Sequence, residues 1–214
     1  AAWVTSEPMI AEMRLQWWLD MVTEIREGRP ACAHEVAAPL TELIAETELP
    51  LEVLEGMINA RQFDIYKSPH ADQAAFDTYI DRTNGNLTWL TALALGAEVK
   101  AEPTVRDAAF AGGVAAILAA TPKLILSGRA PLYDGSAMGI KIVAEEGLAR
   151  LEKSRAGRKT VSRDARAALR AGWQAKNQLQ QAMRAPEALA VGWLDQSEFA
   201  KKSGLLWRTL RNVW

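Results

Sequence analysis

Pairs of acidic residues four positions apart are the residues of this sequence best suited to chemistry. Residues with this spacing lie on one face of a helix, and two carboxylates placed there can share a divalent cation. Several such pairs occur, and Asp77 with Asp81 is the clearest. Their neighbours Phe76 and Ile80 are apolar, so both carboxylates are expected to point outward. We therefore interpret the pair as part of a solvated helix face.

Other kinds of site have few candidate residues. Cys32 is the only cysteine, which excludes an intrachain disulfide and a paired-cysteine zinc site and fits a reducing compartment. His34 and His70 are the only histidines, so a histidine-rich metal site is excluded. No phosphate-binding glycine loop, nucleophile elbow or paired-histidine zinc motif occurs. Asp64 lies three residues after Arg61, and we interpret the two as a structural salt bridge.

Composition narrows the class of protein further. The chain has 214 residues, 49% of them hydrophobic, and a formal net charge of −1. This hydrophobic fraction excludes a disordered chain, and the near-zero charge argues against a nucleic-acid partner. The longest uncharged stretch, residues 108–122, is shorter than the about 20 residues of a spanning helix, so we expect no transmembrane span. A cytoplasmic location, or one peripheral to the inner face of a membrane, is expected.

The elements that position these residues are predicted to be helices only. Strong helix formers dominate, and the prolines fall where helices would begin or end. The pattern predicts an all-α, single-domain bundle of about eight helices. The expected helices cover about 8–28, 33–46, 50–65, 71–95, 104–121, 136–154, 162–184 and 195–214. Pro122 is expected to kink or end the fifth helix, and the basic stretch 153–163 is expected to be a solvated linker.

Two of these helices are expected to form the centre of the bundle. The helix at 71–95 carries a stripe at helical spacing, made by Phe76, Tyr79, Thr83, Leu87, Leu90 and Ala94. The helix at 104–121 contains Gly112 and Gly113, which permit close approach of a neighbouring helix. We therefore expect a central cavity lined by these two helices, with Tyr79 buried.

Several stretches in this order resemble the squalene/phytoene synthase family. The first stretch is Ser6-Glu7-Pro8 with the following Trp17-Trp18, and the second is the segment 54–66. The others are Tyr79 and Gly85, which five residues separate, then Gly128-Arg129, and the segment 167–179. The resemblance covers nearly the whole chain and implies the isoprenoid synthase fold, a helical bundle around a central cavity. Enzymes of this family join two prenyl diphosphates head to head. They hold Mg²⁺ with two aspartate-rich motifs, because hard oxygen ligands recruit the magnesium that binds a diphosphate.

The departures from the family pattern concern those two motifs. The first falls on residues 3–7, where Trp3 replaces an aspartate and only Glu7 is acidic. The second should lie at 116–124, and the whole stretch 108–133 contains no Asp or Glu. Ala120-Thr121-Pro122 resembles instead a branch of the family that includes a mitochondrial respiratory complex I assembly factor. The resemblance therefore implies a fold from which the metal chemistry has been lost.

The resemblance also implies which residues remain of the site. Glu7 and Asp64 are the remnant catalytic candidates, and no residue is expected to bind a metal. The residues expected to line the cavity are Tyr79, Thr83, Gly85, Ala116, Ala120 and Arg129. The family begins further upstream, so we expect one or more N-terminal helices to be missing from residues 1–214.

Three functions follow from this resemblance. The first is a non-catalytic assembly or scaffold protein with a protein partner. The second is a carrier or sensor of a prenyl or other lipid, and peripheral membrane association fits both. The third is an active head-to-head prenyl transferase acting on prenyl diphosphates. No cofactor is expected in the first two cases, and Mg²⁺ is expected only in the third.

Overall fold

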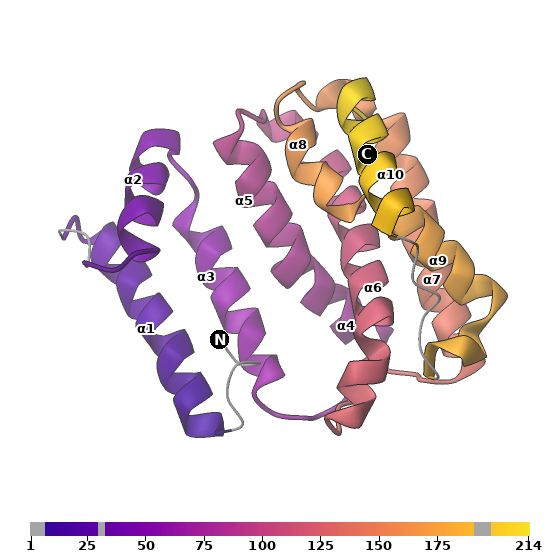
Figure 1. Cartoon of the computed structure of the whole chain (residues 1–214). Coiled ribbons are helices and arrows are strands. Elements are labelled where there is room, and N and C mark those ends of the chain that lie inside the picture. The colour runs from indigo at the N-terminus through magenta and orange to yellow at the C-terminus, as the bar shows by residue number, and fades with distance from the viewer. Residues whose placement is uncertain (1–6, 30–32, 191–197) are drawn as a thin grey trace. The chain divides into compact units, whose positions relative to one another are not determined.

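The structure, a computed structural model, describes residues 7–29, 33–190 and 198–214. Within these residues the fold is all-helical, without strands, as the sequence predicts (Figure 1). The chain divides into two compact units, residues 1–67 and 68–214, and each is described by itself. The eight expected helices correspond to observed helical segments, two of which are interrupted by short stretches of other helix types.

The first unit consists of three helices and a short 3₁₀ turn. They are α1 (Pro8–Arg26), α2 (Ala37–Thr47), α3 (Leu51–Ala60) and η1 (Arg61–Asp64). Pro8 stands at the first helical position of α1, where its missing N–H costs nothing. Helix α1 packs on α3, and the apolar residues Val22 and Ile58 are buried.

The second unit begins with a long helix that is not regular along its length. It comprises α4 (Gln73–Ile80), a π-helical turn η2 (Asp81–Gly85) and α5 (Asn86–Ala94). The Asp72 side chain accepts a hydrogen bond from the Ala75 amide at 2.8 Å and so caps the start of α4.

The remaining elements of this unit surround one central helix. That helix, α6 (Glu102–Leu126), follows the turn η3 (Val99–Ala101). It packs most extensively on α7 (Ala137–Ala156), and also on α9 (Ala175–Arg184) and η2 (Figure 1). After α7 the chain forms η4 (Arg158–Thr160), the short α8 (Arg166–Leu169) and η5 (Arg170–Gly172). Helix α9 is then followed by η6 (Pro186–Ala190) and α10 (Glu198–Arg211).

Helix α6 is largely buried over residues 104–115, which is typical of a core helix. By length and composition Val99–Leu126 is also apolar enough to cross a membrane, with a mean hydropathy of 1.7 in its most apolar window. Half of that window is buried inside the structure. A core helix can pass this test of length and composition as well as a membrane span.

Three expectations from the sequence need correction. Helix α6 does not end at Pro122 but continues to Leu126. The stretch 153–163 is not a solvated linker, because α7 continues to Ala156, η4 follows it, and Ser154 and Val161 are buried. Leu87 does not belong to the buried stripe, because it is 50% exposed while Trp89 is buried. The π-helical turn η2 has hydrogen bonds of a different spacing, so a regular helical period does not continue through it.

Candidate functional site

Three of the predicted cavity residues lie on or next to the π-helical turn η2. Tyr79 precedes it and is buried, as expected, with its ring 5.1 Å from the His70 ring between centroids. Thr83 is buried within the turn, and its hydroxyl donates to the Tyr79 carbonyl at 2.6 Å. Gly85, also buried, ends the turn. Isolated π-helical turns are frequent at functional sites, which makes η2 the natural place to examine.

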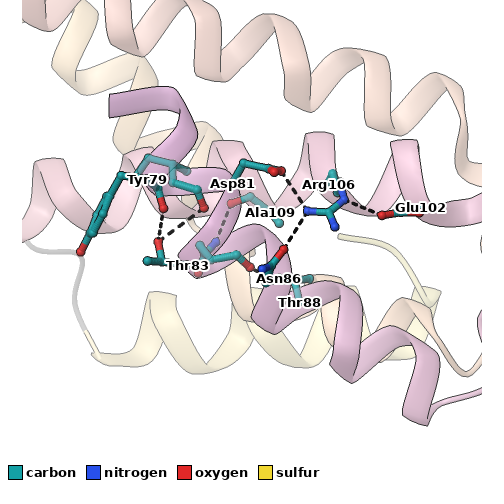
Figure 2. A network of polar contacts seen from close by, with 10 residues as sticks. Tyr79, Asp81, Thr83, Asn86, Thr88, Glu102, Arg106 and Ala109 are labelled. Carbon is teal, nitrogen blue, oxygen red and sulfur yellow. Dashed lines mark hydrogen bonds and ion pairs between the residues drawn. The ribbon is translucent and has the colours of Figure 1, made fainter. Parts of the chain in front are cut away.

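A network of polar side chains joins η2 to α6 (Figure 2). Arg106 of α6 donates to Asp81 at 3.1 Å, to the Asn86 side-chain oxygen at 3.1 Å and to Glu102 at 2.7 Å. Burial alone would lower the pKa of Arg106, but the hydrogen bonds and charges of Glu102 and Asp81 outweigh it and raise that pKa. The guanidinium is therefore fixed as a cation between two carboxylates.

At two glycines of this network an added side chain would meet another side chain at close range. A Cβ on Gly85 would lie 2.8 Å from an Asp81 carboxylate oxygen, so a larger residue there would require that carboxylate to shift. A Cβ on Gly113 would lie 2.8 Å from the Ile80 side chain and 3.0 Å from that of Asn84. The expectation that Gly113 permits close helix approach is confirmed. The Asn84 amide also donates to the Ala109 carbonyl of α6.

Asp77, the other acid of the predicted pair, faces a different arginine. Asp77 is half-buried and lies 3.9 Å from Arg150 of α7, so the expectation that it points outward is wrong. Arg150 also donates to Glu146 at 2.7 Å and lies over the Phe110 ring at 3.9 Å. Burial raises the pKa of Asp77, with a contribution from Glu146, while Arg150 opposes the rise. Asp77 and Asp81 thus each face an arginine of a separate helix.

One residue of the stretch 116–124 of α6, which is expected at the second aspartate motif, lies on a small cleft. Ala116 lies on a cleft of about 120 Å³ that is bordered by Asn84, Gly112 and Gly172. Ligand pockets commonly have about 300–1,000 Å³. The backbones of Gly112 and Gly172 approach each other here, since a Cβ on Gly112 would lie 3.5 Å from the Gly172 Cα. Ala120 is half-buried further along the helix.

The other predicted site residues have local roles. Asp64 is buried, and its carboxylate lies 3.1 Å from Arg61, which confirms the predicted salt bridge. Glu7 is exposed and immediately precedes α1. Gly128 has a left-handed backbone (φ +73°) that ends α6, and the next residue, Arg129, returns its amide to the Leu124 carbonyl at 2.9 Å. Trp3 and Cys32 lie outside the described residues.

Comparison with known proteins now decides the family. A profile of the squalene/phytoene synthase family matches residues 3–198, nearly the whole chain. This chain belongs to the squalene/phytoene synthase family. A comparison with curated proteins and one with solved structures each give no match. Membership in the squalene/phytoene synthase family implies the isoprenoid synthase fold, in agreement with the all-helical architecture.

The donor set of the described residues does not suit the magnesium that squalene/phytoene synthases use. Across residues 7–29, 33–190 and 198–214, no three residues of the ligating types His, Cys, Asp and Glu come together. Asp64, Asp77 and Asp81 each face an arginine, which already supplies the positive charge that a metal would. We therefore derive no reaction step through Mg²⁺.

The polar network itself was not predicted from the sequence. Arg106 stands four residues after Glu102, a spacing that signals a helical ion pair but not a partner on another helix. Asn86 is followed by a mostly apolar stretch, and a polar residue at such a position can signal a buried polar contact. Tyr79, Thr83 and Gly85 do lie together, whereas their role as cavity residues stays a prediction.

Proposed function

We propose that this member of the squalene/phytoene synthase family does not join prenyl diphosphates and acts by binding, as an assembly or scaffold protein. The observation that carries the proposal is the Arg106 network, in which a guanidinium of α6 pairs with the carboxylates of Asp81 and Glu102. The partly buried guanidinium already pairs with both carboxylates, so it would compete with Mg²⁺ for the same oxygens. The missing acids in 108–133 support the same conclusion.

The resemblance of Ala120-Thr121-Pro122 to the branch with the complex I assembly factor indicates what kind of binding to expect. The Thr121 hydroxyl donates to the Ile117 carbonyl at 3.0 Å, and Thr121 is buried, so this tripeptide belongs to the packing of α6. A residue committed to packing is not available to a diphosphate. Binding to a protein partner would explain why the chain keeps the family fold although the acids of the second motif are missing. Lipid binding is the alternative form of this proposal.

Incubation with farnesyl or geranylgeranyl diphosphate and Mg²⁺ tests the loss of catalysis. We expect no release of pyrophosphate and no joined product. Calorimetric titration of the same diphosphates, with and without a chelator, tests the metal. Micromolar binding that disappears with the chelator would refute the proposal, because only a magnesium site produces that dependence. Binding that survives the chelator has another origin and does not bear on this proposal.

Native mass spectrometry separates the two binding roles. The assembly role predicts that the purified protein carries no stoichiometric lipid. It also predicts a defined complex with a protein subunit when the chain is isolated from its own cell. A co-purifying prenyl lipid in one-to-one ratio would replace the assembly role by lipid binding. The variant Tyr79→Phe is a matched control for the lipid arm, because it keeps the buried ring and removes only the hydroxyl.

A further inference from the structure

A cluster of arginines lies where α10 meets the end of α7. Arg155 belongs to α7 and Arg158 to η4, while Arg208 and Arg211 belong to α10. Together with the aromatic rings of Trp207 and Trp214 and the side chain of Val213, they line a cleft of about 460 Å³. This is large enough for a small ligand, and four cations line it.

The cleft is tied to the core of its unit through Trp214. The indole N–H of this buried residue lies 3.3 Å from the hydroxyl of Ser154, to which it donates. Ser154 is fully buried and donates in turn to the Thr104 carbonyl of α6 at 2.8 Å. Main-chain oxygens then orient two arginines: Arg155 donates to the Trp214 oxygen at 3.3 Å and Arg158 to the Asn212 oxygen at 3.2 Å. The cluster is therefore built on fixed groups.

The four arginines of the cluster differ from several other arginines of the chain in their electrostatic partners. Arg26, Arg61 and Arg106 each form an ion pair with a carboxylate. Among the described residues, no Asp or Glu side chain forms such a pair with any arginine of the cluster. Burial and the neighbouring charge of Arg208 lower the pKa of Arg155, against the effect of Glu152. An anion placed in the cleft would relieve this repulsion.

We propose that this cleft binds the phosphate group of an anionic ligand, a phosphate monoester or a diphosphate. The planar guanidinium presents N–H donors in a fork that matches phosphate oxygens, and each arginine here uses few of them within the protein. Arg211 lies over the Trp207 ring at 4.0 Å, which holds its guanidinium at the edge of the cleft. The site stands independently of the proposed assembly role.

The phosphate has two chemical sources, a free phosphate compound or a lipid headgroup. Exposed apolar side chains of α10 are adjacent in sequence to residues that line the cleft, with Leu206 60% and Leu210 73% exposed. An apolar helix face next to a basic cluster is the pattern of helices that lie on anionic membranes. The experiment therefore carries one arm for each source.

In the first arm, pyrophosphate is titrated into the whole chain by calorimetry at fixed ionic strength. In the second, the chain is sedimented with vesicles of phosphatidic acid in phosphatidylcholine, and with phosphatidylcholine alone. Binding of pyrophosphate assigns a free phosphate ligand. Sedimentation with phosphatidic acid vesicles alone assigns a lipid headgroup. Binding in neither arm would overturn the proposal.

Two variants make the result specific to the cluster. Arg211→Gln leaves every hydrogen bond described above intact, and we expect it to weaken binding about tenfold, the usual effect of removing one charged hydrogen bond. The double variant Arg155→Gln with Arg211→Gln should weaken binding about a hundredfold if the two effects add. Arg184→Gln, an exposed residue at the end of α9, is the charge-matched control. An equal loss in the control would show non-specific attraction and overturn the site.

Discussion

Two adjacent glycines of α6 should respond in opposite ways to the same substitution. Alanine is favoured over glycine in a helix interior by about 1 kcal/mol. At Gly112 the added methyl would lie 3.5 Å from the Gly172 Cα and 3.6 Å from Asn84, which are ordinary contacts. We therefore expect Gly112→Ala to raise the free energy of unfolding by up to about 1 kcal/mol.

At Gly113 the added methyl would meet the end of α4, which crosses α6 at this point. It would lie 2.8 Å from the Ile80 side chain, about 1 Å closer than carbon atoms prefer. Ile80 is buried and branched at Cβ, so it cannot swing away. Overpacking of this kind costs about 1–3 kcal/mol, and after the helix gain Gly113→Ala should lose about 1 kcal/mol.

Thermal unfolding followed by circular dichroism measures both variants. Their free energies should differ by about 2 kcal/mol, because one gains what the other loses. For a chain of this size that corresponds to a separation of about 4–8 °C in Tm. Equal Tm values, or a more stable Gly113→Ala, would refute the close crossing of η2 and α6. An open space at that crossing, as a prenyl cavity requires, would produce such a result.

Further predictions concern residues of the same unit. Tyr79→Ala should cost about 3–5 kcal/mol of unfolding free energy, like other large aromatic truncations, measured by urea denaturation without ligand. Arg106→Gln should cost about 1 kcal/mol in the same assay because its partners are partly solvated, whereas Lys100→Gln, in an exposed ion pair, should cost less than about 0.5 kcal/mol. Carboxyl carbon NMR should give Asp77 a pKa above the ordinary 3.8, with a further rise in Arg150→Gln, since Arg150 opposes the rise. The stability that Asp77 contributes is then present below pH 3.8 and lost as the pH rises through its raised pKa. An Asp77 pKa at or below 3.8 would contradict the burial.

The sequence predicts the helices well because its apolar periodicity and its prolines act locally. Asp72 and Ser136 cap α4 and α7 with their own side chains, a signal that a single sequence carries. The continuation of α6 through Pro122 cannot be predicted from the neighbouring sequence, because it depends on packing against α7 and α9. That packing outweighs the one backbone hydrogen bond that proline cannot donate. Packing against other helices thus overrides the tendency of proline to end a helix.

The site was less predictable than the fold for a related reason. The pairings Asp81–Arg106 and Asp77–Arg150 join residues of different helices, and periodicity carries no information on which helices meet. Ser154 also lies in a stretch that composition alone marks as solvated, although the stretch is buried at that residue. Side-chain pairing across helices became visible only once the packing was known.

The π-helical turn Asp81–Gly85 bears on how sequences of this family are aligned. A turn closed by hydrogen bonds to the fifth residue holds one residue more than an α-helical turn. A relative that lacks one residue here can therefore change the turn type and keep the ends of α4 and α5 in place. An alignment gap at this point then marks an altered helix winding and not a lost loop. The spacing from Tyr79 to Gly85 spans this very turn, so matching letters at both ends do not guarantee matching helix faces.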